Sequence, residues 1–250
     1  MKFFVFSDCH GYADELISAL NDVGFDKNNP SNFLIGCGDY FDRGRQPQEI
    51  INFLSSINNK ILVRGNHTDL LVDCIYRGYP QGHDWHNGTA QTIIDLSPKA
   101  KVFSEACDMA HAKVFDFINN MVDYFETKNY IFVHSWIPLK CNDNLPVYYA
   151  KNRKFEFDSN WRNATKKEWE QARWHNPFEL AKQGLLPPKK LLFGHWHTSA
   201  GWAEAENRSE FGPDAKFDPY YGDGFIAIDA CTARSGKVNV LVLEDEFLDQ

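Results

Sequence analysis

Seven short apolar runs constrain the fold of this 250-residue chain more than any other feature of its sequence. Each run is rich in β-branched and aromatic residues, which is typical of a buried strand. The runs cover residues 2–7, 32–37, 60–65, 130–135, 190–194, 224–230 and 237–244. Helical patterns at 13–24 and 47–58 separate the first three runs. Because alternating strands and helices form βαβ units, the pattern predicts an α/β protein with a partly parallel sheet.

The first five runs end in residues that can bind metal ions. Their endings are SDCHG, GDYFDRG, GNHTD, HSW and GHWH. Ligands of open α/β sheets bind beyond the carboxyl ends of the strands, so we expect the five endings to meet at one site. The candidate metal ligands are Asp8, His10, Asp39, Asn66, His134, His195 and His197.

This ligand set is too large for one ion and predicts two divalent ions. A bridging carboxylate, for which Asp39 is the candidate, would hold them about 3.5–4 Å apart. Nitrogen and oxygen donors without a thiolate favour manganese, iron or zinc over calcium or magnesium. Manganese is the first choice, with iron and zinc as alternatives.

Composition and charge limit the possible partners. The net charge of −8 and the pI near 5.6 argue against nucleic acid, whose binding relies on a basic surface. A small phosphorylated substrate needs only a local cluster of cations. No apolar run approaches the length of about 18 residues that indicates a membrane span, so we expect no membrane partner. The six cysteines form no C-x-x-C pair, which favours a reduced, cytoplasmic protein.

The five motifs resemble those of the calcineurin-like metallophosphoesterases, and among them the phosphoprotein phosphatase branch. The branch pattern is GDxHG, GDYxDRG, GNHE, HGG or HAG, and a late GH. Here it is met by SDCHG, GDYFDRG, RGNHT, HSW and FGHWH, between residues 7 and 198. Bacterial and phage members that act on phosphoproteins or on diadenosine tetraphosphate are the most similar in style. The segment WHNGTAQT at 85–92 looks like their NGG-x-x-T segment.

The resemblance implies both a fold and a ligand arrangement. The fold is a four-layer α/β/β/α sandwich, the metallo-dependent phosphatase-like fold, in a single catalytic domain over residues 1–250. The first ion would be held by Asp8, His10 and Asp39, with His197 as a further ligand. The second would be held by Asp39, Asn66, His134 and His195. Asn66 is also expected to contact the substrate.

The resemblance further implies which residues act on the substrate. Arg43 and Arg64 would bind phosphate oxygens, a task for which the planar guanidinium is better suited than a lysine. Arg173, in the segment ARWHNP, is a further candidate for the phosphate. His67, oriented by Asp42, would protonate the leaving group.

Two departures from the family pattern bear on substrate shape. Thr68 replaces the usual glutamate after GNH, and Ser135 with Trp136 replaces small residues after the fourth motif. Three long inserts carry little of the shared pattern and are expected to shape the substrate pocket. They lie at about 76–120, 140–178 and 199–222.

The expected reaction is hydrolysis of a phosphomonoester by direct attack of a metal-bound hydroxide, while the cations and arginines neutralise the phosphate oxygens. The substrate would be a protein carrying phosphoserine or phosphothreonine, or a small phosphorylated metabolite. The alternative is a pyrophosphohydrolase acting on diadenosine tetraphosphate or another nucleotide. A non-catalytic scaffold on the same fold is a third hypothesis, against which the complete ligand set and the pair of Asp42 and His67 argue. The sequence does not decide between the first two.

Overall fold

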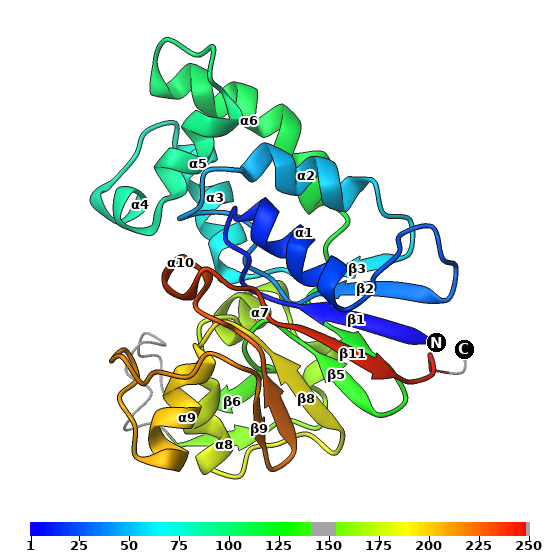
Figure 1. Ribbon diagram of the computed structural model, residues 1–250. Helices are drawn as coiled ribbons and strands as arrows, with labels where there is room; N and C mark the ends of the chain where they lie inside the picture. Colours follow the sequence, from blue (N-terminus) through cyan, green and yellow to red (C-terminus); the bar gives the residue numbers. More distant parts are fainter. Residues whose placement is uncertain (142–153, 249–250) are drawn as a thin grey trace.

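The computed structural model describes residues 1–141 and 154–248 of the chain. Its first sheet has the strand order β11-β1-β2-β3, and its second sheet the order β4-β5-β8-β10-β9. A small two-stranded sheet joins β6 and β7. Figure 1 shows the two large sheets facing each other, with α1 and α2 outside the first sheet and α8 and α9 at the far side of the second.

The strands are short. Those of the first sheet are β1 (Lys2–Phe6), β2 (Asn32–Gly36), β3 (Lys60–Leu62) and β11 (Val240–Glu244). Those of the second sheet are β4 (Phe125–Glu126), β5 (Tyr130–Phe132), β8 (Lys190–Phe193), β9 (Tyr220–Gly222) and β10 (Phe225–Ala227). The small sheet consists of β6 (Leu139–Cys141) and β7 (Phe155–Phe157). The strands β1, β2 and β3 run parallel, as do β5, β8 and β10, whereas β11, β4 and β9 pair antiparallel.

Helices fill the connections between the strands. The first two, α1 (Ala13–Asp22) and α2 (Pro47–Ser55), match the helical patterns of the sequence and end slightly earlier. The later helices are α3 (Asn66–Arg77), α4 (Gly82–Asn87), α5 (Thr89–Leu96), α6 (Phe103–Ile118), α7 (Lys166–Ala172), α8 (Pro177–Lys182), α9 (Thr198–Glu206) and α10 (Thr232–Ser235), with a 3₁₀ turn at Trp161–Asn163. In the described parts of the chain, no helix combines the length and apolarity needed to cross a bilayer.

Three separate cores lie between four layers. Along β1, Phe4 and Phe6 face the helices, whereas Phe3 and Val5 face the second sheet. The second sheet alternates in the same way. Its side chains Ile131, Leu191, Phe193 and Phe225 enter the outer core, and Phe132, Leu192 and Ile226 enter the core between the sheets. Because successive strand residues point to opposite faces, each strand contributes to two cores. The predicted four-layer α/β/β/α sandwich is confirmed, and the single domain over residues 1–250 stays a prediction.

The three inserts contain regular structure where they are described. The first holds α4, α5 and α6, and α6 extends the helix-side core with Ala110, Val114 and Phe117. The second holds β6, β7, α7 and α8, and its residues 142–153 lie outside the described residues. The third holds α9 and β9. Trp136 does not face a substrate, because its ring is buried in the outer core of the second sheet.

Tyr40 joins the ends of β2 and β3 below the loops that follow them. Its hydroxyl is buried and lies 2.8 Å from the carbonyl oxygen of Gly36 and 2.9 Å from that of Val63. The ring packs against Phe6 and Phe117. One side chain thus ties two strand ends to each other and to the insert.

We expect Tyr40→Phe to lower the free energy of unfolding by about 1–2 kcal/mol, because the one hydroxyl proton that two buried carbonyls share and the acceptor of the Gly38 N–H are both lost. Chemical denaturation measures this change. The matched control is Tyr221→Phe, since the ring of Tyr221 is 63% exposed, and its effect should stay within about 0.5 kcal/mol. Equal stability of the wild type and Tyr40→Phe would contradict the role assigned to the hydroxyl.

Candidate active site

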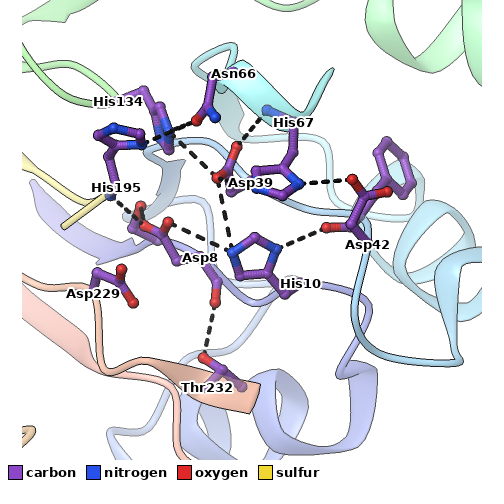
Figure 2. A network of polar contacts seen from close by, with 12 residues as sticks. Asp8, His10, Asp39, Asp42, Asn66, His67, His134, His195, Asp229 and Thr232 are labelled. Atoms are coloured by element: carbon purple, nitrogen blue, oxygen red, sulfur yellow. Dashed lines mark hydrogen bonds and ion pairs between the residues drawn. The ribbon is translucent and has the colours of Figure 1, made fainter. Parts of the chain in front are cut away.

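The ends of five strands bring most of the predicted ligands together. Asp8 and His10 follow β1, Asp39 follows β2, and Asn66 begins α3 directly after the β3 loop. His134 follows β5 and His195 follows β8. Figure 2 shows these side chains pointing toward one another around Asp39. They come from both sheets, so the site lies where the two sheets meet.

Asp39 is the central group of the cluster. Its Oδ2 lies 3.4 Å from Nε2 of His134, 3.8 Å from Nε2 of His10 and 3.9 Å from Nε2 of His67. Two sets of possible ligand atoms therefore share it. One comprises His10, Asp39 and His67, and the other Asp39, His134 and His195, with all atoms of a set within 4.8 Å of one another. A carboxylate common to two such sets is the geometry expected of a bridge between two ions.

Two of the candidate ligand histidines are held in the neutral form. Nδ1 of His10 donates to the carbonyl of Phe41, and Nδ1 of His134 donates to the carbonyl of Cys37, each at 2.9 Å. Burial lowers the pKa of both imidazoles, so the neutral ring is favoured. With Nδ1 protonated, Nε2 of each ring presents a lone pair to the centre.

The contacts of Asn66 test whether a metal ion fits here. Its Oδ1 lies 2.7 Å from Nε2 of His134 and 3.0 Å from Nδ1 of His195. When His134 is neutral with its proton on Nδ1, its Nε2 carries a lone pair and no proton. Oδ1 of Asn66 also carries only lone pairs, so the two atoms face each other without a hydrogen between them. A cation between them would satisfy both, and amide oxygen and imidazole are suitable ligands for a divalent transition metal.

The carboxylates support the same interpretation. Burial and the charges of Asp229 and Asp39 raise the pKa of Asp8. Burial also raises the pKa of Asp39, whereas positive charge on the neighbouring imidazoles, where they are protonated, holds that pKa below its usual value. Oδ1 of Asp8 is buried and has no hydrogen-bond partner in the described structure. Buried acids without cationic side chains between them are the environment that a metal ion neutralises.

The backbone of the site is strained. Eight non-glycine residues of the described chain have positive φ, and all but Asn207 lie in the strand-end loops around the site. The seven are Asp8, His10, Asp39, Asp42, Arg43, His195 and Cys231. Such conformations persist when the surroundings fix them, and they concentrate at functional sites. The last motif has a glycine at position 194 because the backbone there packs closely against Asp8. A Cβ at this position would lie 1.9 Å from Oδ2 of Asp8.

His67 and Asp42 form the predicted pair. Nδ1 of His67 lies 2.7 Å from Oδ2 of Asp42, and both residues are buried. Burial opposes a charge on His67, but Asp39 and Asp42 outweigh burial and raise the pKa of the imidazole. Since Nδ1 contacts Asp42, Nε2 is the atom that faces the centre (Figure 2).

The three predicted arginines are placed differently. Arg43 is exposed beside the site, whereas Arg173 is buried. Nε of Arg173 contacts Asp69 at 2.8 Å, and its Nη1 contacts Asp123 at 2.7 Å. Nε of Arg64 lies 3.5 Å from Asp69. Asp69, directly after the departure at Thr68, therefore links two arginines, a role that the motif pattern did not indicate.

His197, like Asp8, lies outside both sets of ligand atoms. Its Nδ1 is 3.7 Å from Oε1 of Glu210, and its ring packs against Phe211. It is near Asp229, whose pKa burial raises and the charge of His197 lowers. Asp229 itself is buried beside Asp8, as Figure 2 shows. Asp229 belongs to the apolar run 224–230, which predicts a strand, but no motif marks it as a site residue.

The family of the protein follows from its sequence. Residues 1–199 match the calcineurin-like phosphoesterases. The chain belongs to the calcineurin-like phosphoesterase family. The resemblance inferred from the motifs is thereby confirmed, and the chain carries two groups of residues that could hold metal ions.

One curated relative of this family member matches it over a short segment. A symmetrical bis(5'-nucleosyl)-tetraphosphatase of Buchnera aphidicola subsp. Baizongia pistaciae is 37% identical over 73 residues, which are 29% of this chain and 26% of that protein. The chain thus spans about a quarter of the length of the curated relative it matches.

Two solved structures share the fold of this family member. A candidate diadenosine tetraphosphatase matches with a TM-score of 0.50 and 12% identity, over 99% of this chain and 95% of the other. The cold-active protein-tyrosine phosphatase of a psychrophilic Shewanella matches with a TM-score of 0.52 and 15% identity, over 97% of this chain and 75% of the other. At this identity the likeness shows the fold alone.

We expect Asp39→Asn to lose more bound metal than His197→Asn. Asp39 belongs to both sets of ligand atoms and His197 to neither, so the first change should weaken two ions and the second at most one. Elemental analysis after dialysis against a trace of metal measures the difference. An Asp39→Asn protein that retains as much metal as the wild type would refute the bridging role.

Proposed function

We propose that this protein is a phosphoesterase with a dinuclear metal centre that hydrolyses phosphomonoesters. The observation that carries the proposal is the position of Asp39, buried and shared between two sets of ligand atoms. Asp8, His10 and Asp39 would hold one ion, with His197 as a further ligand. Asp39, Asn66, His134 and His195 would hold the other. Two divalent ions, with manganese preferred and iron or zinc as alternatives, would neutralise phosphate oxygens and acidify water.

The side chains of the protein would bind the phosphate and supply a proton. Arg43, which is exposed at the site, would contact phosphate oxygens first, and Arg64 and Arg173 would lie behind it. His67 would donate the proton on Nε2 to the leaving oxygen, while Asp42 keeps Nδ1 protonated and the ring in place. Asn66 would serve the metal and the substrate together.

The proposed substrates are proteins carrying phosphoserine or phosphothreonine, or small phosphorylated metabolites. A dinucleoside tetraphosphate is the second candidate, because the Buchnera relative is a bis(5'-nucleosyl)-tetraphosphatase. Kinetic constants for a phosphopeptide, a sugar phosphate and diadenosine tetraphosphate on the same metal-loaded protein would separate these classes. The net charge of −8 argues against nucleic acid as a substrate.

We expect the purified protein to bind about two transition-metal ions and to hydrolyse p-nitrophenyl phosphate only in their presence. Elemental analysis gives the stoichiometry, and an assay before and after chelation gives the dependence. Restoring activity with manganese, iron or zinc one at a time ranks the metals. Saturation at one ion, or full activity in excess chelator, would reject the dinuclear centre.

A second expected outcome concerns the leaving group. An alkoxide leaves poorly without a proton, whereas nitrophenolate leaves readily without one. His67→Asn should therefore retain both metals but lose about 10²- to 10⁴-fold in kcat on phosphoserine or phosphothreonine. The loss on p-nitrophenyl phosphate should be much smaller.

Asp42→Asn should show the same selectivity more mildly, and the double variant should be little worse than His67→Asn, because the two residues act as a unit. The measurement is kcat on both substrates with metal content determined for each variant. Equal losses on the two substrates at full occupancy would assign His67 to phosphate binding instead of proton transfer.

A further inference from the structure

The junction between α4 and α5 is pressed against the catalytic loop. Gly88 connects the two helices with a φ of 91°, in the region that favours glycine. A Cβ at this position would lie 2.4 Å from the backbone nitrogen of Arg43. The helical insert therefore begins α5 directly on the backbone of the Asp42–Arg43 turn, with no room for a side chain between them.

Two threonines of α5 bind the carboxylate of Asp42. Thr89 donates from Oγ1 to Oδ2 at 2.6 Å, and Thr92 donates from Oγ1 to Oδ1 at 3.1 Å. The hydroxyl of Thr92 also accepts the backbone N–H of Asp42 at 3.0 Å. Thr89 and Thr92 are three residues apart and so share one helix face. Neither threonine nor Asp42 is exposed to solvent.

The two threonines and His67 together give this carboxylate three hydrogen-bond donors. Oδ2 accepts from both Nδ1 of His67 and the hydroxyl of Thr89, while Oδ1 accepts from Thr92. A carboxylate with a single hydrogen bond can rotate about its χ angles, whereas three donors from two helices leave one orientation. Partners of this kind, one contact removed from the reacting group, set the tautomer and direction of an imidazole.

We propose that Thr89 and Thr92 are positioning residues for phosphoester hydrolysis, which hold Asp42 so that it directs the Nε2 proton of His67 toward the leaving group. The inference rests on the proposed function and on the role proposed for His67. If Thr89 and Thr92 position Asp42, the first insert contributes to catalysis through α5 and also contributes side chains to the core. Figure 1 places α5 beside α3, the helix that carries His67.

The variants are chosen to remove hydroxyls without removing volume. Thr89→Val and Thr92→Val delete one donor each, and Thr89→Ser and Thr92→Ser restore it. Thr127→Val is the matched control, because Thr127 is equally buried and donates to Asp245 at 2.6 Å. Thr127 precedes β5 and Asp245 follows β11, so the pair lies at the ends of the sheets opposite the site. Each variant is loaded with metal, and its metal content and melting temperature are recorded.

Kinetics on two esters separate positioning from general damage. We expect Thr89→Val to lose about 10-fold in kcat on phosphoserine and the double valine variant about 10²-fold, with little change on p-nitrophenyl phosphate. The serine variants should recover most of the loss, and Thr127→Val should match the wild type on both esters. In a His67→Asn background the valine changes should cost nothing further. Equal losses on both esters, an additional loss without His67, or unchanged turnover of phosphoserine would each overturn the proposal.

A spectroscopic measurement tests the positioning without relying on turnover. In the zinc-loaded protein, the Nδ1 proton of His67 should give a downfield resonance in the wild type and in Thr127→Val, since that proton is hydrogen-bonded to Asp42. The resonance should shift upfield or disappear in Thr89→Val and return in Thr89→Ser. An unchanged resonance in Thr89→Val would overturn the positioning role. If the wild type hydrolyses neither ester, the proposed function fails, and this resonance still decides whether the threonines fix Asp42 and His67.

Discussion

A carboxylate as deeply buried as that of Asp39 is costly, because desolvation of an ion is repaid only by opposite charge and hydrogen bonds. The protein gives it a backbone N–H from His67, at 3.1 Å from Oδ1, and places Nε2 of His10 and His134 beside Oδ2, where a bound cation would neutralise the charge. Each of those groups stands at the end of a different strand or the start of a helix. The strained φ of Asp39 itself, 53°, is maintained by this surrounding structure. The convergence of the loops is thus a condition for burying this one charge.

Two acids of the same loop take opposite roles because their neighbours differ. Asp39 faces the lone pairs of neutral histidines and is the proposed ligand of a cation, whereas Asp42 faces only hydrogen-bond donors. Two residues separate them, and with positive φ at Asp42 its side chain lies toward α5. The proposed metal centre and the proposed proton donor could therefore be close without competing for the same carboxylate. The insert supplies the donors that keep this division fixed.

The sequence indicated the buried strands and their polar ends because both have local patterns. The seven apolar runs correspond to β1, β2, β3, β5, β8, β10 and β11. The strands β4, β6, β7 and β9 were missed, since two or three residues at a sheet edge carry no measurable alternation. The same limit applies to the site. Thr89 and Thr92 act on Asp42 through tertiary contacts some fifty positions apart in sequence, and Asp229 reaches Asp8 from the other end of the chain.

The arginines of the site differ in whether a carboxylate already balances their positive charge. Arg173 is held by Asp69 and Asp123, and Arg64 lies against Asp69, so the positive charges of these two arginines are balanced by two carboxylates. Arg43 makes no hydrogen bond or ion pair within the described residues and is exposed. A phosphate entering the site would therefore meet one guanidinium without an ion-pair partner, and at Arg64 or Arg173 it would compete with Asp69. Most of the charge needed to bind a dianionic ester must then come from the metal centre, which makes substrate affinity more dependent on metal occupancy here than in a site with several free arginines.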